Sequence, residues 1–189
     1  YRFDDFRKRI KNKLSISGFK FKIDPDNILE TSYNVLAFEE ISNWLSTFRI
    51  SYINNIGVDL GGLTKDWMTK LSKEFTNPKC YLFDSTDKNM SFQPNPLSKY
   101  KIPNYKNYFK FAGMFIARCI IQQVCVNVHF TRAFLKQILH RRIRFEDLES
   151  VDDEKFNSLN FYLQNDLDNY PEFYFEVDKI ENDKIETIE

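Results

Sequence analysis

The segment 107–123 repeats large apolar side chains at helical spacing, and this constrains the fold more than any other part of the chain. Its apolar positions, which recur every three or four residues along one face, are Tyr108, Phe111, Ala112, Phe115 and Cys119. A face this rich in aromatic rings has to be covered by other elements, because exposed apolar surface opposes folding. The chain can supply the cover, since 42% of its 189 residues are hydrophobic and 16% are aromatic. The sequence therefore predicts one large core with this helix at its centre.

Most of the remaining patterns are helical, with a few short strands between them. Helical patterns with an apolar stripe cover 1–14, 28–37, 63–75 and the segments that begin at 131 and 150. The stripes of the last two helices consist of Phe134, Leu135, Ile138 and Leu139, and of Phe156, Leu159 and Leu163. Alternation of apolar and polar residues predicts strands over 19–23 and 48–52, and a last strand over 173–177 that lacks a partner. The expected fold class is α+β and mainly helical.

Charge and cysteine content exclude several classes of protein. Lys plus Arg equals Asp plus Glu at 27 each, so no net charge attracts a nucleic acid or an anionic membrane. No apolar run approaches the roughly 18–20 residues that span a bilayer. Cys80, Cys119 and Cys125 are odd in number and form no CxxC pair, which favours a reducing compartment over a disulfide framework. We expect a protein of the cytoplasm or the nucleus, with no nucleic-acid or membrane partner.

No reactive cluster identifies an active site. The two histidines, His129 and His140, have no acidic residue at zinc-ligand spacing, so no metal and no other cofactor is expected. The glycine-rich segment 54–62 lacks the spacing of a phosphate-binding loop and is more typical of a structural turn. Cys80 is the most exposed candidate for a reactive thiol, and Lys79 is its only evident activator.

Several sequence blocks in one order carry a family resemblance instead. They read NILETSY at 27–33, GVDLGGLTKDW at 57–67, LSKEFTNP at 71–78, YFKFAG at 108–113, FTRAFLK at 130–136 and DLESVD at 147–152. Together they resemble the N-terminal lobe of HECT ubiquitin ligase domains, and the FTRAF stretch is most similar to the giant ligases of that family. The chain departs from the family at Lys65 and Met114, where the family has arginine. It also departs at 54–57, where the family has a glutamate-glycine pair and this chain has Asn-Asn-Ile-Gly.

The resemblance implies a fold and two binding sites. Residues 1–165 would form the large subdomain of a HECT N-terminal lobe, and 166–189 would begin a truncated small subdomain that binds the ubiquitin-conjugating enzyme. The residues assigned to that binding are Tyr162, Leu163, Phe173 and Phe175. A second, noncovalent ubiquitin site is implied at Met90 and Phe92, with Met90 in place of the family's aromatic residue. A plain hairpin packed on its own core remains the alternative reading of that arm.

The resemblance also implies a function. The lobe would scaffold the transfer of ubiquitin from a conjugating enzyme to a cysteine on a C-terminal lobe, and then to a substrate lysine. None of the three cysteines has the Thr-Cys-Phe-like context of the family's nucleophile, so no catalytic residue is expected here and the fragment alone is expected to be inactive. The implied partners are a ubiquitin-conjugating enzyme, ubiquitin and protein substrates. Two alternatives stay open: a catalytically inert interaction module derived from a HECT lobe, and an unrelated cysteine hydrolase, which needs one reactive thiol.

Overall fold

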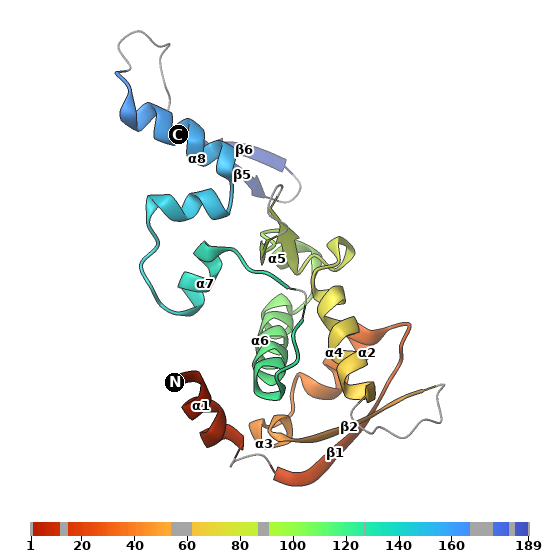
Figure 1. Ribbon diagram of the computed structural model, residues 1–189. Helices are drawn as coiled ribbons and strands as arrows, with labels where there is room; N and C mark the ends of the chain where they lie inside the picture. Colours follow the sequence, from red (N-terminus) through yellow and green to blue (C-terminus); the bar gives the residue numbers. More distant parts are fainter. Residues whose placement is uncertain are drawn as a thin grey trace. The chain divides into compact units, whose positions relative to one another are not determined.

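The computed structural model describes residues 2–11, 15–53, 62–86, 91–126, 128–166, 176–181 and 184–188 (Figure 1). These residues belong to two compact units. Unit 1 lies within Tyr1–Ser85 and Met90–Phe130, and unit 2 lies within Thr86–Asn89 and Thr131–Glu189. The subdomain boundary expected between 165 and 166 stays a prediction.

Unit 1 is mainly helical with a few short strands, as the periodicity predicts. Its elements are α1 (Arg2–Lys11), β1 (Ser15–Ile23), α2 (Ile28–Leu36), α3 (Ile41–Trp44), β2 (Ser46–Tyr52), α4 (Gly62–Phe75), the 3-10 turn η1 (Pro78–Cys80), β3 (Phe83–Ser85), β4 (Phe92–Pro94), α5 (Ser98–Lys101) and α6 (Tyr105–Gln122). Across the part of the chain that the structure describes, no helix combines the length and the apolar character needed to cross a membrane.

β1 and β2 lie side by side as a parallel pair (Figure 1). The pairs in register are Phe19 with Phe48, Phe21 with Ile50 and Ile23 with Tyr52. Along β2 every second residue from Ser46 is buried, so the alternation that predicts this strand is confirmed. Parallel strands need a crossover connection, and α2 and α3 provide it.

Trp67 of α4 lies at the centre of an aromatic cluster. The residue is fully buried, and its ring lies 5.8, 6.0 and 5.7 Å from the rings of Phe21, Phe48 and Phe115. The indole N–H donates to the Ser32 hydroxyl at 2.9 Å, which satisfies the one polar group of the ring. Because α6 contributes Phe115 to this cluster, the predicted central helix is confirmed.

A buried arginine joins α6 to the start of β2. Arg118 is 3% exposed and donates to the carbonyls of Trp44 at 2.8 Å and Ser46 at 2.7 Å. Its guanidinium also lies 4.4 Å from the centre of the Phe48 ring. Burial lowers the pKa of Arg118 to about 10, and its Nε has no hydrogen-bond partner among the residues that the structure describes. Two carbonyls and an aromatic face thus hold this cation in place of a carboxylate.

The described residues of unit 2 form three helical elements and a hairpin. They are α7 (Arg132–Ile138), the 3-10 helix η2 (Phe145–Ser150), α8 (Asp153–Gln164), β5 (Val177–Glu181) and β6 (Lys184–Ile188). β5 pairs with β6 in antiparallel register, with Ile180 opposite Ile185. Most of the strand predicted over 173–177 lies outside the described residues; its last residue, Val177, begins β5 and pairs with Ile188 of β6.

The aromatic cluster generates a stability prediction. Replacing Trp67 with alanine is expected to lower the free energy of unfolding by about 3–5 kcal/mol, because the change removes buried apolar surface and leaves a cavity among three rings. Urea unfolding followed by circular dichroism measures this loss.

A matched control is Phe38→Ala. Phe38 is 75% exposed and makes one edge contact with Tyr33, so this variant should lose about 1 kcal/mol or less. A Trp67→Ala protein as stable as the control would show that Trp67 is not central to the core.

Candidate functional site

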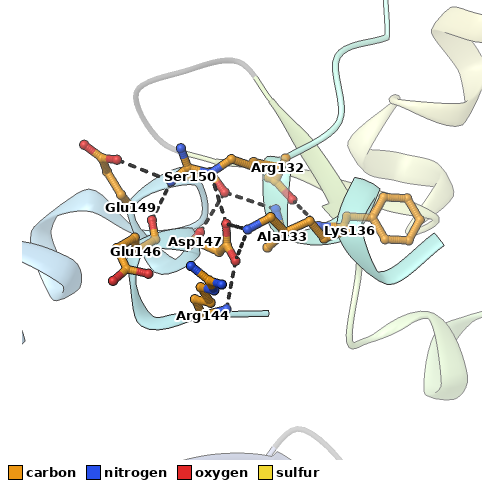
Figure 2. A network of polar contacts seen from close by, with 10 residues as sticks. Arg132, Ala133, Lys136, Arg144, Glu146, Asp147, Glu149 and Ser150 are labelled. Carbon is orange, nitrogen blue, oxygen red and sulfur yellow. Dashed lines mark hydrogen bonds and ion pairs between the residues drawn. The ribbon is translucent and has the colours of Figure 1, made fainter. Parts of the chain in front are cut away.

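Two of the sequence blocks come together around one buried carboxylate in unit 2. Asp147 of η2 is 1% exposed, and its side chain lies between two cations of α7 (Figure 2). Arg132 Nε lies 3.1 Å from Oδ1, and Lys136 Nζ lies 2.7 Å from Oδ2. Arg132 and Lys136 are one helical turn apart, so both side chains reach the same carboxylate. This contact joins FTRAFLK to DLESVD.

The rest of the network ties backbone groups of the two segments. The Arg144 backbone N–H donates to Asp147 Oδ2 at 2.8 Å. The Ser150 hydroxyl donates to the Asp147 carbonyl at 2.7 Å and accepts the Ala133 N–H at 3.3 Å. Arg132 also reaches the Glu146 carbonyl, and it lies 3.5 Å from the exposed Glu149 carboxylate (Figure 2). Side-chain and main-chain contacts together fix α7 against η2.

The network keeps the Asp147 carboxyl ionised. The Lys136 ammonium, followed by the Arg144 N–H, holds the pKa of Asp147 below its usual range, while burial acts in the opposite direction. A buried carboxylate with these partners stays ionised at neutral pH. The sequence contains a signal for this contact, because two cations four residues apart precede the acid-rich segment 146–154. Sequence reasoning identified both blocks but not their pairing.

α8 follows this network and carries apolar side chains on its surface. The Asp152 side chain caps the helix by accepting the Lys155 N–H at 2.8 Å, and Phe156 packs on Phe145 with ring centres 5.0 Å apart. None of the residues of α8 is buried. Its exposed large side chains are Leu159, Phe161, Tyr162 and Leu163, the last at 72%. Large apolar side chains grouped on one helix are typical of a protein interface.

Two of the four residues assigned to the conjugating enzyme are therefore close together. Tyr162 and Leu163 are adjacent near the end of α8, and the Tyr162 ring meets the Phe161 ring edge-on at 5.9 Å. Phe173 and Phe175 lie outside the described residues. The binding role of all four stays a prediction.

The second predicted site is described only at Phe92. This residue begins β4, where it pairs with Ser85, and its N–H donates to the His129 carbonyl at 2.6 Å. Phe92 is half-buried, and Met90 lies outside the described residues, as does segment 54–61. The noncovalent ubiquitin site stays a prediction.

The environments of two cysteines oppose thiol chemistry. Burial and the nearby Glu74 carboxylate raise the pKa of Cys80, whose sulfur lies 3.9 Å from Glu74 Oε2. Burial also raises the pKa of Cys119 to about 12. Cys125 is exposed. Because the thiolate is the nucleophile, a raised pKa disfavours reaction at Cys80 and Cys119.

Metal ligation gains no support from the side chains that the structure places. Within the described ranges, no group of three or more His, Cys, Asp or Glu side chains is arranged to hold a metal ion.

Comparison with known proteins identifies similar chains. A family model described as HECT-domain (ubiquitin-transferase) matches residues 69–189. Similar proteins include E3 ubiquitin-protein ligase UPL1 of Arabidopsis thaliana, 31% identical over 183 residues, TOM1 of Saccharomyces cerevisiae, 35% over 158, and NEDD4 of Rattus norvegicus, 32% over 169. The matched regions cover 95%, 81% and 87% of this chain. The chain spans only 5%, 5% and 19% of the length of these relatives.

The buried carboxylate generates a prediction about acid stability. Because the folded-state pKa of Asp147 is lowered, its stabilisation is complete above the unfolded value of about 3.9 and is lost as the pH falls through the lower folded-state pKa. Asp147→Asn should therefore lower the urea midpoint at pH 7 and flatten the acid branch of the stability curve. Circular dichroism of urea unfolding at a series of pH values measures both effects.

Glu149→Gln is the matched control for this experiment. The Glu149 side chain is 59% exposed and lies 3.5 Å from Arg132, so its loss should change the midpoint little. If Asp147→Asn and wild type lose stability in parallel as the pH falls, the Asp147 carboxylate does not support the unit.

Proposed function

Because the chain belongs to the HECT-domain (ubiquitin-transferase) family, we propose that it is part of a HECT-type E3 ubiquitin-protein ligase. The match over residues 69–189 carries this proposal, since it covers well over half of the chain. The three relatives named above are E3 ubiquitin-protein ligases by name, and each aligns with more than four fifths of this chain. Within such a ligase, the chain forms the N-terminal lobe, with 1–165 as the large subdomain and 166–189 as the start of the small one.

The proposed role of this lobe is to position other groups. Holding a conjugating enzyme near an acceptor cysteine turns a bimolecular thiol transfer into an effectively unimolecular step. The reacting cysteine belongs to another lobe, since Cys80 and Cys119 have raised pKa values and Cys125 lacks the family's sequence context. The partners are then a ubiquitin-conjugating enzyme, ubiquitin and protein substrates.

The surface proposed to receive the conjugating enzyme includes Tyr162 and Leu163. Large apolar and aromatic side chains at the centre of an interface contribute most of the binding energy, and both residues are partly or largely exposed before binding. Their helix is held at its first turn by the Asp152 cap and by Phe156 against Phe145. A fixed helix loses little conformational entropy when a partner binds.

The first test changes this surface. Leu163→Asp should weaken binding of a ubiquitin-conjugating enzyme by about tenfold or more, because a carboxylate would replace an apolar contact and would have to be desolvated. Calorimetric titration of wild type with a set of conjugating enzymes first identifies one that binds, and the variant is then titrated with that enzyme.

Ile41→Asp serves as the control for this test. Ile41 of α3 is 67% exposed, close to the value for Leu163, but belongs to unit 1. Binding that is unchanged by Leu163→Asp, or weakened equally by both variants, would contradict the assignment of the surface to α8.

The second test concerns the nucleophile. With ubiquitin, activating enzyme and conjugating enzyme, this chain should form no ubiquitin adduct that a reductant removes, because Cys80 and Cys119 favour the thiol form. Non-reducing electrophoresis detects such an adduct. A reductant-sensitive adduct that disappears when Cys80, Cys119 or Cys125 is replaced with alanine would overturn the proposed role.

A further inference from the structure

The loop between α7 and η2 concentrates positive charge in a chain with no net charge. Residues 131–144 contain five Lys or Arg and no Asp or Glu, whereas 145–154 contain six Asp or Glu and no Lys or Arg. Two of the five cations, Arg132 and Lys136, are paired with Asp147. The remaining three are Arg141, Arg142 and Arg144, all exposed.

These three guanidinium groups have no carboxylate partner among the described residues. Asp147 and Glu149, which are close to them in sequence, form ion pairs with cations of α7, and Glu146 is exposed. None of the ion pairs among the described residues involves Arg141, Arg142 or Arg144. An exposed guanidinium group without an ion-pair partner can bind an incoming anion, and little free energy is lost in removing water from it.

The loop backbone is anchored at both ends. Two residues after the end of α7, His140 has a left-handed backbone with φ 50°, and its N–H donates to the Gln137 carbonyl at 3.0 Å. The Arg141 N–H bonds the Lys136 carbonyl at 2.8 Å, and the Arg144 N–H bonds the Asp147 carboxylate at 2.8 Å. The arginines are therefore presented from a positioned backbone, which lowers the entropy lost on binding.

The loop also borders a hollow and exposed apolar side chains. Arg142, Ile143, Arg144, Phe145 and Glu146 line a hollow of about 450 Å³. Glu146 offsets one of the two arginine charges there, and Arg141 adds a third positive charge beside it. Ile143 is 43% exposed and Leu139 is 64% exposed. Cationic and apolar groups thus occur on the same short stretch of chain.

We propose that this surface, defined by Leu139, Arg141, Arg142, Ile143 and Arg144, binds an acidic peptide segment of a protein partner that carries apolar residues among its carboxylates. Charge complementarity selects the acidic residues, and the exposed Ile143 and Leu139 select the apolar ones. A nucleic acid fits less well, because Phe145, the aromatic ring that lines the hollow, is half-buried and already packs on Phe156. The inference concerns binding alone and does not depend on the proposed ligase role.

The test measures binding of short fluorescein-labelled peptides to the whole chain by fluorescence anisotropy. The probe alternates Glu with Leu, one comparison peptide has Gln in place of every Glu, and a labelled oligouridine tests nucleic acid. Wild type should bind the Glu/Leu peptide best. Raising the ionic strength from about 0.1 M to about 1 M, which shortens the Debye length from about 10 Å to about 3 Å, should weaken that binding.

Two variants and one control locate the site. Arg142→Glu with Arg144→Glu should weaken binding of the Glu/Leu peptide by about tenfold or more, and Ile143→Ser by about threefold or more. The matched charge reversal is Lys106→Glu with Lys110→Glu, two exposed lysines of α6, which should leave affinity unchanged. Circular dichroism verifies that each variant is folded. If the charge reversal does not fold, Arg142→Lys with Arg144→Lys replaces it; this variant keeps the positive charge and removes the guanidinium groups.

Several results would overturn the proposal. These are no binding of the Glu/Leu peptide by wild type at millimolar concentration, equal binding of the Gln/Leu peptide, tighter binding of oligouridine, or equal losses in the arginine and lysine charge reversals.

Discussion

Unit 2 depends on a single carboxylate that has been removed from water. Asp147 is stable where it lies because Arg132, Lys136 and the Arg144 N–H all reach it. Removing one partner of a buried ion pair lowers the free energy of unfolding by more than the intact pair contributes to it, because the other charge is left buried without a partner. Both proposed binding surfaces adjoin η2. The loop that carries Arg141, Arg142 and Arg144 leads directly into η2, and α8 begins after Asp152.

In unit 1, buried polar groups are satisfied without a buried carboxylate at the centre of the contacts among the described residues. Two of its buried polar groups lie among aromatic rings: the Trp67 N–H is satisfied by Ser32, and Arg118 donates to two carbonyls and lies over the face of Phe48. Apolar burial supplies most of the stability there, so acid is expected to affect unit 1 less than unit 2. A fall in pH therefore acts first on the contacts that position the proposed binding surfaces.

Periodicity predicted the elements of unit 1 better than the surfaces of unit 2. β2 and α6 were predictable because the residues that alternate or recur along them are the buried ones, as at Phe48 and Phe115. The stripes of α7 and α8 were recognised by the same rule, yet Leu139 and Leu163 are exposed. An apolar stripe records that a helix is amphipathic and not what covers it. Arg118 was missed because a charged residue inside an apolar helix gives no periodic signal, and the Asp147 pairing was missed because it is a tertiary contact.

The contrast between Arg118 and the loop arginines explains why the loop stays at the surface. Burying Arg118 required two backbone carbonyls, an aromatic face and a pKa lowered to about 10, and within the described part of the chain its Nε still lacks a partner. Between Leu139 and Phe145, the backbone N–H groups of Arg141 and Arg144 donate to the carbonyl of Lys136 and the carboxylate of Asp147, while the arginine side chains are exposed. The exposed guanidinium groups of Arg141, Arg142 and Arg144 can therefore donate hydrogen bonds to water or to acceptors that another molecule brings. Because water leaves their charge uncompensated and an acidic segment does not, the same network that fixes unit 2 also leaves this loop available to a partner.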